Sequence, residues 1–97
     1  MKVRVTPRAG RDLQNIRDFY HRENPSAATR VAQEILSAIA LLRRRPDIGI
    51  RSIRKPDIRS KLVTGLPYRI HYRVRGGVLE IVHIRHTAKR PWPEGVP

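Results

Sequence analysis

The sequence predicts an α+β domain in which a helical hairpin packs on one face of a small, mostly antiparallel sheet, in the order β-α-α-β-β-β. Two observations lead to this prediction. Residues 68–75 alternate apolar and basic side chains, which is the period-2 pattern of a strand. Between residues 7 and 44 apolar side chains instead recur every three or four positions, as on a helix with one buried face.

The chain is expected to begin with a short strand over residues 2–5, followed directly by a helix from about 7 to 22. Thr6 can cap this helix, and Pro7 suits its first position because the missing N–H has no partner there. The apolar stripe of the helix consists of Ala9, Leu13, Ile16 and Tyr20.

A second helix is expected to follow at once, with Asn24 or Ser26 as its N-cap and Pro25 in or next to its first turn. Three arginines close it, where cations complement the helix dipole, and Pro46 stops it. Its apolar positions form a dense helical pattern: Val31, Ala32, Ile35, Leu36, Ile39 and Leu42. The short link between the helices predicts an antiparallel hairpin.

The C-terminal half is expected to supply most of the sheet. Residues 47–57 are interpreted as an ordered loop or short extended piece, and 58–64 as a strand with Leu62 and Val63 facing inward. A hairpin of residues 68–86 follows, with its turn at the two glycines 76 and 77. A two-residue turn would place Arg73 opposite Glu80, and a longer turn would change that pairing. The apolar run 78–84 indicates a strand covered on both faces.

Size and composition limit the possible classes of protein. Ninety-seven residues suit one domain, 1–97, of which 88–97 form a proline-rich tail. The chain has no cysteine, which fits a reducing cytoplasm, and it has no long apolar run that would indicate a signal peptide or membrane span. A net charge of +13 favours a polyanion or an acidic protein as partner.

Motifs along nearly the whole chain resemble the ParE/RelE toxin superfamily of type II toxin–antitoxin modules. They are Ala9-x-x-Asp12-Leu13-x-x-Ile16, Leu42-x-x-x-Pro46-x-x-Gly49, Leu66-Pro67-Tyr68-Arg69-Ile70-x-Tyr72 and Ile84-x-His86-Thr87-x-Lys89-Arg90. The resemblance implies a growth-arresting toxin, neutralised by a cognate acidic antitoxin and needing no cofactor. ParE-like members act on DNA gyrase, whereas RelE-like members cut mRNA in the ribosomal A site. The ending of the chain is more similar to ParE and its plasmid-stabilisation relatives, so we favour that branch.

The resemblance also implies a set of residues for ribonuclease activity. Arg69 matches a catalytic arginine of RelE-like toxins, and Arg59 and Lys61 lie near their paired lysines if the following turn has one extra residue. Lys89 or Arg90 lies near a second catalytic arginine. The usual C-terminal tyrosine is missing, although His86 can transfer a proton instead.

Each of these residues also has a structural interpretation. Arg69 can stack on the flanking aromatic rings or pair with Asp12, and His86 can anchor the tail; we favour both structural roles. His71 and His83 lie on strands without cysteine or clustered acids nearby, so we expect structural histidines and no metal site.

A group of residues around the end of the second helix and in the tail is expected to bind the target or the antitoxin. The alternative for its basic members is a solvated face with favourable helix-dipole terms. The group consists of Arg43, Arg44, Arg45, Arg51, Arg54, Lys55, Arg90 and Trp92.

Overall fold

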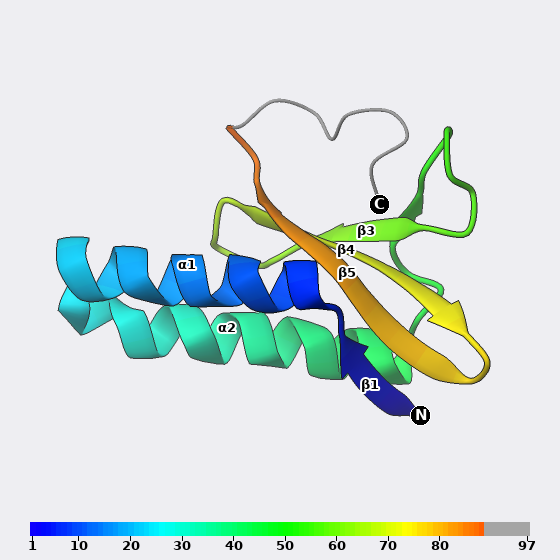
Figure 1. The fold of residues 1–97 in the computed structure, drawn as a ribbon, viewed down its shortest axis with the longest axis horizontal. Helices are drawn as coiled ribbons and strands as arrows, with labels where there is room; N and C mark the ends of the chain where they lie inside the picture. The colour runs from blue at the N-terminus through cyan, green and yellow to red at the C-terminus, as the bar shows by residue number, and fades with distance from the viewer. Residues whose placement is uncertain (89–97) are drawn as a thin grey trace.

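The computed structural model describes residues 1–88, in which two helices cover one face of a five-stranded sheet (Figure 1). The elements are β1 (Lys2–Val5), α1 (Pro7–Glu23), α2 (Pro25–Arg44), β2 (Ile50–Arg51), β3 (Arg59–Leu62), β4 (Tyr68–Arg75) and β5 (Val78–His86). The strand order is β1-β5-β4-β3-β2, with β1 parallel to β5 and all other pairs antiparallel. The predicted α+β class and the helical hairpin are therefore confirmed.

Local sequence explains the helix boundaries. The Thr6 hydroxyl accepts a hydrogen bond from the Ala9 N–H at 3.2 Å, so the expected N-cap of α1 forms. Asn24 is the single residue between the helices and serves α2 as N-cap through its backbone carbonyl, while its side chain accepts from the Ser26 hydroxyl and caps no backbone N–H. So short a link forces α1 and α2 to run antiparallel, side by side.

The core lies between the helical hairpin and the sheet. From β4 it takes Tyr68, Ile70 and Tyr72, the apolar set of the alternating pattern, which are 6%, 0% and 0% exposed. Val74 continues that pattern but is 46% exposed; it lies two residues before the β4–β5 turn, and Figure 1 shows that this end of the hairpin extends beyond the helices. The helices contribute Ala9, Ile16, Val31, Ile35, Ile39 and Leu42.

The β4–β5 hairpin turns at the two glycines, as predicted, and of the turn lengths left open by the sequence it has the two-residue one. Gly76 and Gly77 have φ values of 58° and 73°, which glycine adopts without a Cβ clash. Arg73 accordingly lies opposite Glu80, and its Nε lies 2.8 Å from Glu80 Oε1. The register then shifts, since Tyr72 pairs with Ile81 but His71 pairs with His83. Val82 is the extra residue of this β-bulge.

Strand β5 is buried along its length, as the apolar run predicted. Residues 79–84 are all less than 9% exposed, including the polar Glu80 and His83. The helices cover one side of the strand. On the other side, arginine side chains lie over the polar residues: Arg4 and Arg73 contact Glu80, and Arg8 contacts His83. Arginine guanidiniums therefore cover the polar residues on the side of β5 that carries no helices.

The structure adds one strand to the predicted order and corrects two details of the next one. Residues 50–51 form β2, a two-residue edge strand that agrees with the short extended piece expected in this segment. Strand β3 is shorter than the predicted 58–64. Leu62 does not face the core: it is 43% exposed while Val63 is fully buried, because neighbouring residues of an extended chain point to opposite sides.

A buried tyrosine ties the segment after α2 to the sheet. The Tyr72 hydroxyl donates to the Pro46 carbonyl at 2.8 Å and accepts from the Gly49 N–H at 2.9 Å. Gly49 is required here, since a Cβ on this residue would lie 2.3 Å from that hydroxyl. We call this arrangement the Tyr72 clasp; it fixes the start of β2 and hence the loop that β2 carries.

Candidate functional site

The sheet face turned away from the helices, called the open face, carries most of its polar side chains. Since directly paired residues of antiparallel strands share a face, its members follow from the register. They are Ser60 and Leu62 on β3, Arg69, His71, Arg73 and Arg75 on β4, and Val78, Glu80, His83 and Arg85 on β5.

Two arginines lie directly opposite each other on this face. Arg69 pairs with Arg85 in the register, and both side chains are half-buried. Arg69 Nη1 donates to Ser60 Oγ at 2.9 Å, a partner that neither structural alternative from the sequence, stacking on aromatic rings or pairing with Asp12, had included. Like charges directly opposite are unfavourable in a sheet, and an anion between them would relieve the repulsion. This part of the open face is suited to a phosphate or carboxylate.

Two histidines, His71 and His83, lie on the open face beside the two arginines, and His83 contacts α1. The rings of His71 and His83 stack with centroids 5.7 Å apart. Asp12 Oδ2 lies 2.7 Å from His83 Nδ1 and accepts the Ile84 N–H at 2.9 Å. Burial works to raise the pKa of Asp12, but these two hydrogen bonds hold it below its usual value. Asp12 therefore orients His83 and covers the edge of β5 where β1 has ended, which is a structural role.

His71 is held in its neutral form. Burial and, after it, the charges of His83 and nearby arginines lower the pKa of His71 to about 4. A neutral imidazole among arginines reduces the repulsion along this face. Within residues 1–88, no group of three or more His, Cys, Asp or Glu side chains gathers where it could hold a metal ion.

The other end of the open face carries an ion-pair network around Glu80. Arg4 and Arg73 both bond this buried carboxylate, and hydrogen bonding to Arg73 is the main reason that its pKa is lowered. Arg73 and Arg75 also lie 3.8 and 3.9 Å from Asp57 Oδ2. These arginines are engaged by acids, and they lie at the other end of the open face from Arg69 and Arg85.

The residues predicted for ribonuclease activity are not gathered on one face. Arg59 and Lys61 pair with Tyr72 and Ile70 in the register, which places them on the helix side of the sheet. Arg69 lies on the other side, the open face. Arg59 Nη1 donates to the carbonyls of Asp47 and Gly49, at 3.2 and 3.0 Å. Its guanidinium therefore supports the segment after α2.

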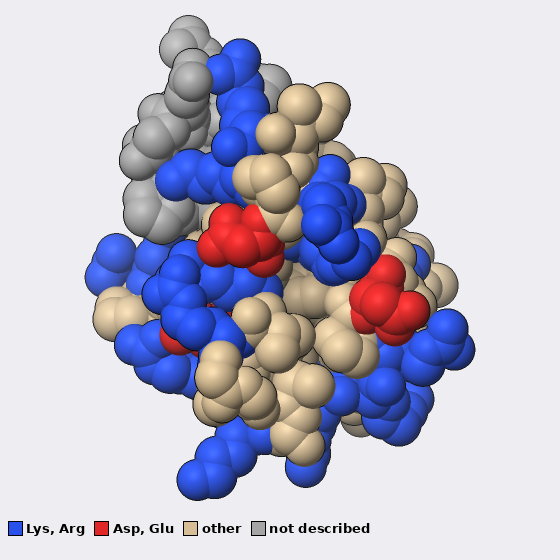
Figure 2. Space-filling view, turned by 90° about the vertical axis from the view of Figure 1, so that its right-hand side faces the viewer, with Lys and Arg blue, Asp and Glu red and all other residues tan. Residues whose placement is uncertain are grey.

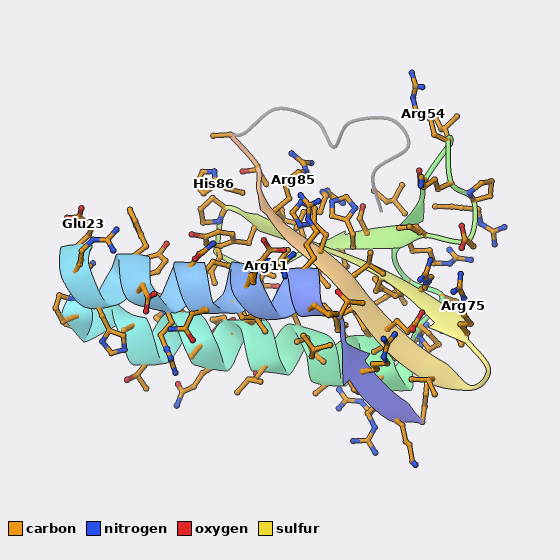
Figure 3. The ribbon with its side chains drawn as sticks, viewed as in Figure 1. Arg11, Glu23, Arg54, Arg75, Arg85 and His86 are labelled. Carbon is orange, nitrogen blue, oxygen red and sulfur yellow. The ribbon has the colours of Figure 1, made fainter. Side chains whose placement is uncertain are left out.

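His86 lies on the same side as Tyr68, with the two rings edge to face at 5.3 Å. Its Nδ1 accepts the Ala88 N–H at 3.0 Å, which anchors the chain just after β5. Figure 3 shows that Arg85 and His86 project to opposite sides of the strand. Lys89, the last member of the ribonuclease set, lies outside the described residues.

The segments that carry the basic group, the end of α2 and the loop after β2, lie at the lower and upper right of Figure 1, and Figure 2 shows lysines and arginines spread over that end of the molecule. Arg43, Arg44, Arg45, Arg51 and Arg54 are exposed, and Lys55 is half-buried. Arg45 makes a long ion pair with Asp47 at 3.9 Å. Arg90 and Trp92 lie outside the described residues.

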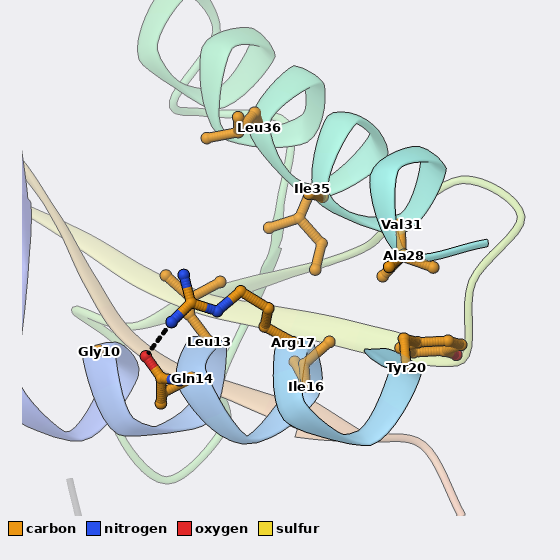
Figure 4. Close-up of a pocket in the computed structure, with 11 residues that line it drawn as sticks. Gly10, Leu13, Gln14, Ile16, Arg17, Tyr20, Ala28, Val31, Ile35 and Leu36 are labelled. Carbon is orange, nitrogen blue, oxygen red and sulfur yellow. Dashed lines mark hydrogen bonds between the residues drawn. The ribbon is translucent and has the colours of Figure 1, made fainter. Parts of the chain in front are cut away.

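An apolar groove runs between the two helices (Figure 4). It has a volume of about 250 Å³ and is bordered by Leu13 and Tyr20 of α1 and by Ala28 and Leu36 of α2. Leu36 is 65% exposed, so an apolar side chain faces solvent in the middle of a helix. Arg17 also lines the groove, where it donates to Gln14 Oε1 at 2.8 Å.

The family is decided by comparison with known proteins. Residues 3–91 match the family described as the ParE toxin of the type II toxin–antitoxin system parDE. The chain belongs to the ParE/RelE family of type II toxins. Membership makes it the toxin component of a toxin–antitoxin pair, with a cognate antitoxin as partner.

Individual relatives of this toxin carry both family names. It is 38% identical to toxin RelE2 of Caulobacter vibrioides over 84 residues, which cover 87% of this chain and 92% of that one. Its fold is similar to a chain of the chromosomal ParDE system from P. aeruginosa, with a TM-score of 0.75, 26% identity and coverage of 89% and 95%. A YoeB/ParE toxin from Agrobacterium tumefaciens shares the fold, with a TM-score of 0.65, 24% identity and coverage of 89% and 98%.

Sequence reasoning missed several residues of the site. Arg85 and Ser60 join Arg69 only through the β-bulge and the β3–β4 register, neither of which has a clear local signature. For the apolar groove the sequence did contain a signal, namely Leu36. It belongs to the dense apolar stripe of α2, but it lies at the edge of that stripe and is exposed. Within residues 1–88, the toxin has no helix of sufficient length and hydrophobicity to span a membrane.

Proposed function

We propose that this toxin arrests growth in the cytoplasm by inhibiting DNA gyrase, and that a cognate acidic antitoxin neutralises it. The observation that carries the proposal is the match of residues 3–91 to the ParE toxin family, whose ParE-like members act on gyrase. Inhibition by binding needs no catalytic centre.

The positions of the candidate ribonuclease residues support this choice. Charge stabilisation of a phosphoryl-transfer reaction needs cations that converge on one phosphate. Arg59 instead bonds two backbone carbonyls on the helix side of the sheet, and Arg69 bonds Ser60 on the open face. A role in binding a protein target makes no such demand on their arrangement.

Purified toxin is expected to inhibit the supercoiling of relaxed plasmid by gyrase, or to stabilise cleaved DNA, at stoichiometric concentrations. The matched control is the same toxin after preincubation with the product of the adjacent gene, the expected antitoxin, which should restore supercoiling. Normal supercoiling at stoichiometric excess, together with growth arrest in cells, would exclude gyrase as the target.

The groove between α1 and α2 is our candidate site for the antitoxin. An amphipathic helix can place its apolar side against Leu13, Tyr20 and Leu36, and a net charge of +13 favours acidic residues on its flanks. A second copy of the toxin is disfavoured as the occupant, because two chains of this charge repel each other.

Leu36→Asp is expected to weaken binding of the antitoxin by about tenfold or more, because it puts a charge where an apolar side chain is covered. Titration calorimetry with the adjacent gene product would measure this change. Val74→Asp is the control, since Val74 is similarly exposed but lies outside the groove. Equal affinities of the Leu36→Asp variant and the wild type would remove the groove as the site.

The second candidate function is ribosome-dependent cleavage of mRNA. The cationic pair of Arg69 and Arg85 on the open face and the likeness to toxin RelE2 favour it. It predicts codon-phased cuts in translated messages that disappear in the Arg69→Ala and His86→Ala variants. Intact messages during growth arrest would rule it out.

A further inference from the structure

The loop between β2 and β3 presents the most exposed large apolar side chain of the described chain. We call residues 50–58 the finger. Ile53 on the finger is 97% exposed, and Ile50 at its base is 68% exposed. A single exposed isoleucine is ordinary on a protein surface. The unusual feature is the fixed framework of hydrogen bonds that holds this one away from the core.

Three hydrogen bonds hold the finger in one shape. The Ser52 N–H donates to the Ile58 carbonyl at 2.8 Å, and the Ile58 N–H donates to the Lys55 carbonyl at 2.8 Å. The Lys55 N–H donates to Ser52 Oγ at 3.1 Å, which closes the loop from its other side. Ile58 is 3% exposed and anchors the finger in the protein interior. A loop already ordered in this way loses little entropy when it binds.

The base of the finger is also fixed. Gly49, the residue before β2, is held by the Tyr72 hydroxyl, and its carbonyl accepts from Arg59. The segment on either side of Ile53 is thereby tied to the centre of the sheet.

Positive charge surrounds the exposed isoleucine. Arg51, Arg54 and Lys55 are its near neighbours in the chain, and Figure 3 shows Arg54 at the tip of the finger, directed away from the sheet. The acid of this segment, Asp57, lies within ion-pair distance of Arg73 and Arg75. The finger thus combines an apolar tip with a cationic surround, and Figure 2 shows that lysines and arginines outnumber acidic side chains on this end of the molecule.

We propose that the finger is the element by which the toxin docks on its target protein, with Ile53 entering an apolar pocket that has an acidic rim. This inference rests on the proposed function, in that the toxin acts by binding a protein. Interfaces commonly combine an apolar centre with a polar rim, and the finger has this arrangement. Contacts to phosphates alone would use the cations and leave Ile53 without a role.

The test compares Ile53→Ser with Phe19→Ser, a control that removes another exposed apolar side chain, on α1. Expression is induced in steps, and the inducer level that arrests growth is measured. Ile53→Ser should need about tenfold or more toxin than the wild type, whereas Phe19→Ser should not differ from it. Ile53→Leu should restore arrest, because it keeps the apolar volume. Unfolding midpoints should be unchanged, since Ile53 contributes little to the core.

Arrest by Ile53→Ser at the wild-type inducer level would overturn the proposal. A band-shift assay with a short DNA duplex gives a second decision: loss of DNA affinity in Ile53→Ser would make the finger a nucleic-acid wedge and also overturn it. The gyrase assay separates the two proposals. If wild-type toxin leaves gyrase unaffected while Ile53→Ser still relieves arrest, gyrase is the wrong target and the finger docks on another protein.

Discussion

Removing the hydroxyl of Tyr72 is expected to lower the free energy of unfolding substantially, because this one group makes two hydrogen bonds in the protein interior. The ring is fully buried, and its hydroxyl bonds both the Pro46 carbonyl and the Gly49 N–H. Burial also raises the pKa of Tyr72, against an opposing effect of the Gly49 N–H, so the hydroxyl stays protonated and donates. Tyr72→Phe keeps the ring and deletes only these two hydrogen bonds.

The expected loss follows from the groups left without partners. A buried N–H or C=O that loses its hydrogen bond costs about 1–3 kcal/mol. Gly49 is buried and should incur that cost, whereas Pro46 is half-buried and water can satisfy part of its carbonyl. We therefore expect the free energy of unfolding to fall by about 2–4 kcal/mol. For a domain of this size, that corresponds to a melting temperature lower by about 10 °C or more.

Urea unfolding followed by circular dichroism measures this difference. Tyr20→Phe is the matched control: Tyr20 is half-buried and hydrogen-bonds Tyr68, so its hydroxyl should be worth about 1 kcal/mol. A Tyr72→Phe variant within about 0.5 kcal/mol of the wild type, the range of ordinary surface changes, would refute the Tyr72 clasp. The finger would then lack the anchored base on which its proposed role depends.

Three further outcomes are expected. The free energy of unfolding should fall as the pH falls from 6.5 to about 4, because His71 in the unfolded chain binds a proton at its ordinary pKa of 6.5 while the folded protein holds it neutral. A series of urea unfolding curves at different pH values measures this, and His71→Gln should flatten that part of the series. Glu80→Gln should be less stable than the wild type at pH 7. This difference in stability should disappear in acid, where the wild-type carboxylate takes up a proton; hydrogen bonding to Arg73 lowers the pKa of that carboxylate from 4.5. Arg59→Gln should lower the melting temperature more than Arg69→Gln, because Arg59 bonds two backbone carbonyls, and calorimetry of both variants measures this.

The elements that sequence periodicity predicts are those with a long repeat and a clear boundary. Thr6 and Pro7 mark the start of α1, and the Arg43–Pro46 segment marks the end of α2 within a residue or two. The hairpin was predictable for the same reason, since Gly76 and Gly77 mark a turn between two strand-like runs, although the length of that turn was left open. These signals are local, and they need no knowledge of the partner strand.

Features that depend on pairing between distant segments were not predictable. Strand β2 has only two residues, and it exists because the Tyr72 clasp brings residue 49 to the sheet beside β3. Leu62 and Val63 are both apolar, so composition alone cannot decide which one faces the core. The position of β3 along β4 determines this choice, and the five-residue connection from 63 to 67 leaves that position open in the sequence.

The same dependence on register separates the ribonuclease residues of the family from one another in this chain. In a hairpin without a bulge, Arg69 would lie opposite Ile84, and Arg85 would lie on the helix side of the sheet. The extra residue Val82 reverses the alternation, so Arg85 joins Arg69 on the open face while His86 turns toward Tyr68. A bulge therefore creates the cationic pair and removes the histidine from it. The ribonuclease hypothesis is therefore tested by comparing Arg85→Ala, at the position that the bulge brings beside Arg69, with Arg69→Ala and His86→Ala; cleavage that survives Arg85→Ala would show that this pair has no role in it.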